Sequence, residues 1–255
     1  MDEHNHYRAL EAVFVSTFLE ELIPGIIHNF ANPLNGIMGR GQIMRRRFDQ
    51  LAARFEQSSP QSTLEQMEIF KKLSADINEI NSECDRFYNM FQDVSWKFYS
   101  LSNHDSGKFS LYQLLATELR FAEYYLNFKH QVKKEIQLEE SIPPVSGDYA
   151  NCALSIWALL RQAMLDMNGL WNKTLLIKTI RKKHSVKVYF EYPVPPLNRQ
   201  DETPAGTGAP EYGAAVGNPN ENLLPLADSL LRTMDAKVEI EEEGERRRLI
   251  VELSH

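Results

Sequence analysis

Apolar or small residues recur at alternating spacings of three and four through two long stretches of the first hundred positions. The first stretch contains Ile27, Phe30, Leu34, Ile37, Gly41, Met44, Phe48 and Leu51, and the second contains Phe70, Leu73, Ile77, Ile80, Cys84, Phe87, Phe91, Val94, Phe98 and Leu101. This spacing is the heptad pattern of two helices with one apolar seam each. The polar segment 57–62, which contains a proline, predicts a turn between them. We therefore expect an antiparallel helical hairpin in residues 1–101.

A lone hairpin shields such a long apolar seam poorly. Two hairpins that pair into a four-helix bundle bury the seam on all sides. The pattern therefore favours a homodimer, although the C-terminal half of the same chain could also cover the seam.

The second half of the chain has a different pattern, which begins after an expected linker at 102–108. Expected helices are 109–128, 149–167 and 223–234, expected strands are 132–138, 174–180, 185–192, 236–242 and 247–253, and expected loops are 141–148 and 193–222. Helices and strands mixed in this order predict an α/β sandwich in residues 109–255, with helices on one face of a mixed sheet. The chain as a whole is then of the α+β class.

Composition narrows the function classes. Apolar residues make up 43% of the chain and charged residues 25%, which is ordinary for a soluble globular protein. No stretch approaches the roughly 18 apolar residues of a membrane span. Two cysteines, Cys84 and Cys152, are too few for a disulfide framework, which favours a reducing cytoplasm. The net charge of −7 argues against nucleic acid and anionic membranes as partners, and the histidines show no metal-site spacing.

The segment 25–37 carries the candidate chemistry. Asn32 and Pro33 are typical of a helix start, but the heptad runs through Pro33 without a break, which predicts one helix that is kinked or loosened there. His28 then falls beside the seam and faces outward. A strip of small or neutral polar residues continues on the same face at Asn32, Asn35, Gly39 and Gln42. This arrangement suits a nucleophile offered to a docking protein, whereas the alternative is an ordinary surface histidine.

The motif His28-x-x-x-Asn32-Pro33-Leu34, placed on a long heptad helix, resembles the H-box of bacterial sensor histidine kinases. The resemblance covers nearly the whole chain, because the order of elements after Lys108 matches the ATP-binding domain of these kinases. It implies that His28 is a phosphoacceptor on a dimerisation and histidine phosphotransfer hairpin. It also implies that Asn32 helps to align water when a response regulator is dephosphorylated.

The second half departs from the kinase pattern at each nucleotide-binding motif. Gln162 stands where the kinases have the magnesium-binding asparagine, and Pro193 and Pro195 stand where two glycines are expected. A proline adds a ring and removes an N–H donor where glycine permits close approach of a nucleotide. No glycine-rich phosphate loop occurs near 222–226. Asn29 also replaces the acid that acts as general base next to the histidine, and a carboxamide cannot accept a proton at neutral pH.

Together with the residues, the resemblance implies a cytoplasmic, dimeric histidine phosphotransferase of a two-component phosphorelay, which passes a phosphoryl group between response-regulator aspartates through His28. About a dozen residues precede the first expected helix, so we expect no sensor domain among them. We expect no bound cofactor, with magnesium supplied by the partner's receiver domain. Two alternatives are a non-catalytic dimeric adaptor that sequesters a regulator and a divergent histidine kinase or phosphatase. Expected site residues are His28 and Asn32 for catalysis, and Asn29, Asn35, Gly36, Gly39 and Arg40 for partner binding.

Overall fold

The computed structural model describes the chain except residues 1–2, 56–61, 103, 105 and 196–222. It divides into two compact units: a hairpin unit, Pro24–Ser95, and a sheet unit formed by Met1–Ile23 and Trp96–His255. These boundaries differ from the expected division into 1–101 and 109–255. The expected turn at 57–62 and most of the expected loop at 193–222 lie outside the described residues.

The hairpin unit consists of parts of two long helices, α2 (Ile23–Phe55) and α3 (Ser62–Ser102). Pro33 lies inside α2, so the interpretation of a single helix running through this proline is confirmed. Far from Pro33, Leu51 of α2 and Leu73 of α3 belong to a small buried cluster. Nearer to Pro33, Phe30 and Phe87 meet edge to face with ring centroids 5.1 Å apart. Within the described ranges, no helix has the length and apolar character needed to cross a bilayer.

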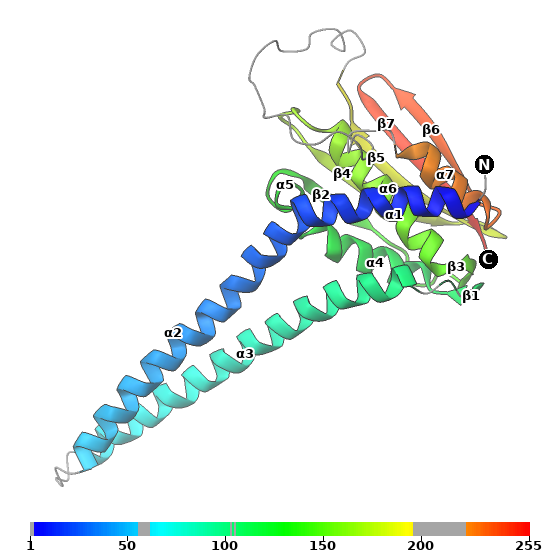
Figure 1. The fold of residues 1–255 in the computed structure, drawn as a ribbon. Helices are drawn as coiled ribbons and strands as arrows, with labels where there is room; N and C mark the ends of the chain where they lie inside the picture. Colours follow the sequence, from blue (N-terminus) through cyan, green and yellow to red (C-terminus); the bar gives the residue numbers. More distant parts are fainter. Residues whose placement is uncertain (1–2, 56–61, 103, 105, 196–222) are drawn as a thin grey trace. The chain divides into compact units, whose positions relative to one another are not determined.

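The sheet unit contains a five-stranded mixed sheet with the order β2-β4-β5-β7-β6 (Figure 1). Its strands are β2 (Lys133–Gln137), β4 (Thr174–Arg181), β5 (Ser185–Pro193), β6 (Lys237–Glu243) and β7 (Arg246–Ser254). Only the β2–β4 pair is parallel. Strand β5 buries every second residue, from Val186 to Tyr192, which places one face of the sheet in the core.

Helices cover that face of the sheet. They are α4 (Leu111–Ala122), α5 (Leu126–Gln131), α6 (Tyr149–Asp166) and α7 (Leu224–Arg232). The first residues of α6 are fixed by its N-cap, because the Asp148 side chain accepts a hydrogen bond from the Asn151 backbone N–H at 2.8 Å. Helix α6 then runs almost wholly buried through the unit. The observed order of helices and strands agrees with the predicted α/β sandwich.

Two short strands differ from the prediction. Strand β1 (Ser106–Phe109) lies mostly in the expected linker, and β3 (Val145–Asp148) lies in the expected loop 141–148. They pair antiparallel, with Gly107 opposite Gly147. Neither segment alternates between apolar and polar residues, so the pairing comes from the surrounding fold and not from a local pattern.

The N-terminal residues also differ from the prediction, because a helix begins at Glu3. Helix α1 (Glu3–Thr17) and the π-helix η1 (Phe18–Leu22) belong to the sheet unit. Phe14 packs against Trp157 of α6 with ring centroids 5.0 Å apart. Glu21 binds Arg161 of α6 through both carboxylate oxygens. The N-terminal segment is therefore part of the core of this unit.

A buried ion pair lies beside this N-terminal helix. The Lys97 ammonium, at 0% exposure, donates to both carboxylate oxygens of Glu118 at 2.8 Å. It also lies over the rings of Phe14 and Phe121, with 5.3 and 5.8 Å to the centroids. Burial lowers the pKa of Lys97 and raises the pKa of Glu118, so each group depends on the other to keep its charge.

We expect Lys97→Met to lower the free energy of unfolding by about 3–5 kcal/mol, because Glu118 would stay buried without its cation. The double variant Lys97→Met/Glu118→Leu should recover much of this loss. Urea denaturation measures both, with Lys108→Met on the exposed strand β1 as the control. A single variant as stable as the wild type would contradict this account of the core.

Candidate functional site

His28 lies on the solvent-exposed side of α2, and Asn32, Asn35 and Gly39 are exposed with it. Their spacings of four, three and four residues place them on one face of the helix. A Cβ atom added to Gly39 would meet nothing within 4 Å. The expected polar strip therefore exists as an open surface beside His28.

Another side of α2 is turned away from solvent. Ile26 and Pro33 are buried on it. Asn29 is also buried, with 6% of its surface exposed, and a docking protein would not reach it as it reaches His28. Gly36 faces Glu83 of α3, because a Cβ atom at this position would lie 3.3 Å from the Glu83 Cγ. Gly36 thus makes room for the facing helix, and its expected role in partner binding stays a prediction.

Arg40 also points toward α3. It donates to the Asp76 carboxylate at 3.3 Å, and its guanidinium lies 3.8 Å from Glu79. Asp76 accepts a second hydrogen bond from Arg47, although only 2% of the Asp76 side chain is exposed. The sequence analysis missed Asp76. The expected seam continues from Leu73 to Ile77, so a carboxylate at position 76 gave no signal of burial in the sequence.

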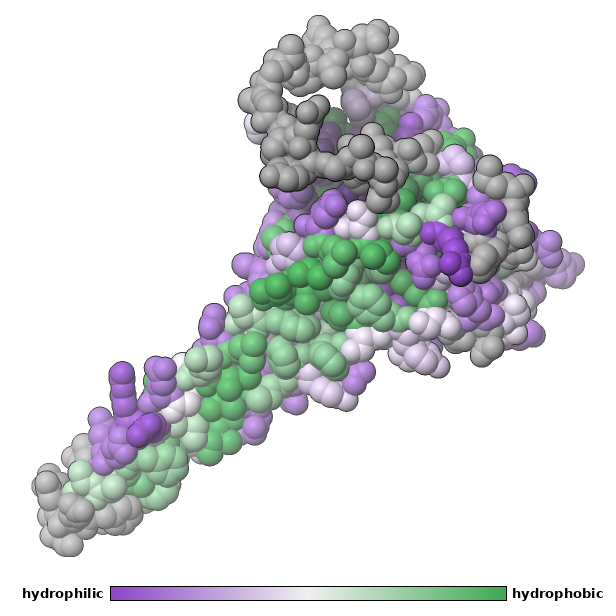
Figure 2. Space-filling view, viewed as in Figure 1, coloured by the Kyte–Doolittle hydropathy of each residue, from purple (hydrophilic) through white to green (hydrophobic). Residues whose placement is uncertain are grey.

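A third face of α2 is apolar and exposed. Ile27 is 64% exposed and Met38 is 63% exposed, with Leu34 between them. Helix α3 shows a matching stripe at every seventh residue, namely Phe70, Ile77, Cys84 and Phe91. Figure 2 shows apolar residues along the length of the hairpin. We call these residues of α2 and α3 the apolar stripe, and within one chain it stays largely uncovered.

In the sheet unit, the residues at the positions of the nucleotide motifs bind one another. The Gln162 amide accepts a hydrogen bond from the Leu223 backbone N–H at 2.9 Å and donates one to Asp166 at 2.8 Å. Asp166 also accepts from the Tyr192 hydroxyl at 2.8 Å and from Arg247 at 2.6 Å. Burial raises the pKa of Tyr192, and the Asp166 carboxylate adds to this effect. The groups are therefore engaged within the chain.

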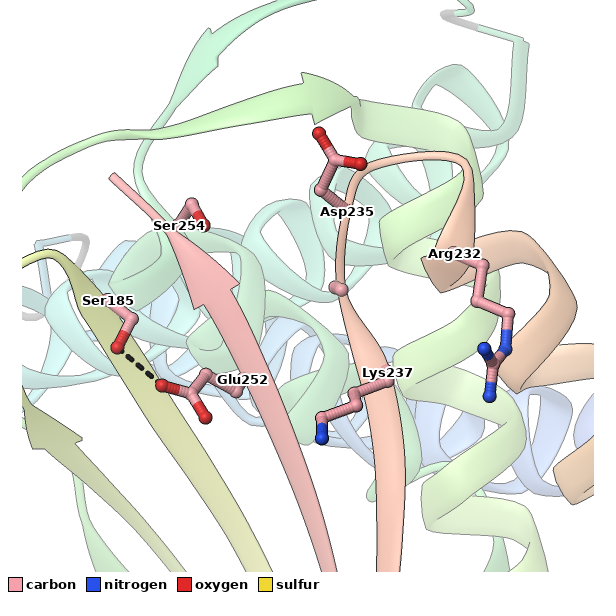
Figure 3. Close-up of a pocket in the computed structure, with 7 residues that line it drawn as sticks. Ser185, Arg232, Asp235, Lys237, Glu252 and Ser254 are labelled. Carbon is pink, nitrogen blue, oxygen red and sulfur yellow. Dashed lines mark hydrogen bonds between the residues drawn. The ribbon is translucent and has the colours of Figure 1, made fainter.

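A separate pocket of about 450 Å³ lies where α7 meets the ends of β6 and β7 (Figure 3). Ser185 donates to Glu252 at 2.6 Å across its floor, and this hydrogen bond helps to lower the pKa of Glu252. Lys237 and Arg232 also line it, and both pair with nearby carboxylates. The lining contains no histidine or cysteine. In the described part of the chain, no three His, Cys, Asp or Glu side chains gather to hold a metal.

Comparison with known proteins gives structural neighbours only. No protein-family model matches the chain, and no curated protein matches it in sequence. The histidine kinase AdeS of Acinetobacter baumannii is 12% identical with a TM-score of 0.43, and the match covers 82% of this chain and 95% of that one. A histidine kinase from Burkholderia phymatum is 14% identical with a TM-score of 0.44, covering 88% and 97%.

A further match is the histidine kinase ThkA, in a structure with the response regulator protein TrrA. It is 14% identical with a TM-score of 0.43, and the match covers 98% of this chain and 65% of that one.

We expect Mg-ATP not to bind at a functional level. Pro193 lacks an N–H donor, and the amide of Gln162 is already bound to Leu223 and Asp166. Isothermal titration of the full chain with Mg-ATP should therefore give no heat of specific binding, and γ-labelled ATP should leave the isolated chain unlabelled. A low-micromolar dissociation constant would refute this expectation, and so would label on His28.

Proposed function

We propose that the chain is a histidine phosphotransferase that carries a phosphoryl group on His28 between the aspartates of two response regulators. The observation that carries this proposal is the geometry of α2: an exposed imidazole stands at one end of an open, uncharged strip. The resemblance of residues 28–34 to the H-box supports the same role.

The chemistry needs little more than a well-placed imidazole. Neutral imidazole is the nucleophilic form of a histidine side chain. One ring nitrogen of His28 attacks the phosphorus of a phosphoaspartate, an N–P bond forms, and the acyl P–O bond breaks. The aspartate leaves as a carboxylate, and the phosphorylated imidazolium loses the N–H proton of its second ring nitrogen to water. Transfer to a second aspartate reverses these steps.

The reactivity of the phosphoryl donor allows an asparagine, Asn29, to stand beside the histidine. An acyl phosphate is already reactive, so no neighbouring base has to activate the imidazole. Catalysis is then mainly the alignment of the nucleophile, the phosphorus and the leaving oxygen. Magnesium would be held by the partner's receiver domain.

The proposed homodimer would bury the apolar stripe and leave the His28 face of α2 exposed. Each α2 has one face packed on α3, one face with the apolar stripe and one face with His28. Burying a Leu, Ile, Phe or Met side chain stabilises by about 1.5–3 kcal/mol, so a second copy that covers the apolar stripe gains substantially. The His28 face would stay in solvent, because it belongs to neither packed surface.

We expect His28→Gln to abolish label transfer from a phosphorylated receiver domain while the dimer and receiver binding persist. Glutamine keeps a polar side chain but has no nucleophilic nitrogen. The matched control is His184→Gln, at an exposed position of the sheet unit. Transfer by the His28 variant would rule out the mechanism, and a wild-type chain that binds receivers without any transfer would favour the adaptor alternative.

Asn32 has a separate expected effect, on the hydrolysis of the phosphoaspartate of a response regulator. If its amide orients the attacking water, Asn32→Ala should slow dephosphorylation of a regulator more than phosphotransfer. Label release and label transfer are measured on the same variant. An equal loss of dephosphorylation and phosphotransfer would mean that Asn32 mainly shapes α2 beside Pro33.

Dimerisation is expected to fail in Ile77→Glu, because an unpaired charge in an apolar interface is costly. Ile77 is 44% exposed in the single chain, so the hairpin itself should tolerate the change. Asn78→Glu, next along α3 and also exposed, is the control. Light scattering should give a monomer for the first variant and a dimer for the second. A monomeric wild type at micromolar concentration would contradict the dimer.

A further inference from the structure

Charge is distributed unevenly over the helix that carries His28. The whole chain has a net charge of −7, yet α2 contains five arginines and one aspartate, a net charge of +4. All of these charges follow Gly39, and the part of α2 that contains His28 has no Lys, Arg, Asp or Glu. An uncharged segment with the nucleophile is thus followed on the same helix by a basic segment.

Two of these arginines are used inside the hairpin. Arg40 and Arg47 both bind the buried Asp76, and Arg47 also donates to the Lys72 carbonyl at 2.9 Å. Their guanidinium groups therefore help to hold α2 against α3. A partner protein would have to compete with Asp76 for either of them.

Arg46 is placed differently. It is exposed, and among the described residues it makes no ion pair. It lies eighteen positions after His28, which is about five complete turns and about 27 Å of α-helix. Because whole turns return to the same face, Arg46 ends the strip that runs from His28 through Asn35 and Gln42.

From this placement we infer that Arg46 is an electrostatic anchor for the acidic surface of the protein that docks on His28, an inference that rests on the proposed function. A small globular domain is about 30 Å across, so one partner can reach His28 and Arg46 together. The strip between them carries no charge, and Gly39 leaves it open, so the partner can lie close along it. Such a partner has a carboxylate cluster about 27 Å from its phosphorylated aspartate.

An exposed charge at the rim of an interface acts mainly on the rate of association and its dependence on salt. Arg46→Glu should therefore lower kcat/KM for transfer from a phosphorylated receiver domain about tenfold at low ionic strength. The kcat value should stay unchanged, because Arg46 is far from the reacting atoms. The difference from wild type should shrink in high salt, since the screening length falls to about 3 Å at 1 M.

The experiment uses the full chain and a panel of receiver domains phosphorylated with a small acyl phosphate. Arg46→Lys should restore most of kcat/KM, because it keeps the charge. Lys71→Glu is the matched control, since Lys71 is exposed on α3 and its replacement changes the net charge equally. A role in folding alone would not give a salt-dependent loss confined to kcat/KM.

Each other outcome overturns the inference. If Arg46→Glu and Lys71→Glu lose kcat/KM equally, the effect is one of net charge and Arg46 is no anchor, while the proposed function stands. If wild type transfers no label to His28, the proposed function fails and this inference with it. If Arg46→Glu leaves receiver transfer intact but abolishes binding to duplex DNA or to phosphatidylserine vesicles, the anchor serves a different class of partner.

Discussion

The packing of α2 against α3 is the interaction on which the proposed docking surface depends. It fixes which side of α2 faces α3, through Phe30, Gly36 and Arg40, and thereby which sides stay exposed. The buried Asp76 strengthens this choice, because it binds Arg40 and Arg47 from two successive heptads of the same helix face. An unpaired buried carboxylate is costly, so a sliding or rotation of α2 would be opposed by the loss of both contacts.

The sheet unit has a buried core between one face of its sheet and its helices. Gln162, Tyr192 and Arg247 all bind Asp166, so polar groups at the nucleotide-motif positions satisfy one another. Buried polar groups need such partners, and a network of this kind supplies them without a ligand. The unit also holds the end of η1 in place, because Arg161 binds Glu21.

The sequence predicted those elements whose pattern is local. The hairpin helices, helix α6 and strands β4, β5, β6 and β7 all repeat with the period of their structure, so counting apolar positions finds them. The pairing of β1 with β3 depends on contacts that no period records. Helix α1 was missed although Tyr7, Leu10 and Phe14 follow a helical spacing, because its place was decided by contact with Trp157.

The apolar spacing also could not tell which apolar residues of α2 and α3 face each other within one chain. Phe87 meets Phe30, whereas Ile77 and Ile27 stay exposed. For the same reason, the exposed face of His28 was predictable from its position, while the buried state of Asn29 and the role of Asp76 were not.

The central claim is that a phosphoryl group rests on His28 during transfer between two aspartates. The most direct measurement is to mix the wild-type chain with a phosphorylated receiver domain, map the modified residue by mass spectrometry under conditions that preserve phosphohistidine, and then add a second, unphosphorylated receiver. The account predicts phosphate on the peptide that contains His28, followed by its loss from that peptide as the second receiver becomes labelled. Phosphate on another residue, or direct passage between the receivers with His28 never modified, would contradict it.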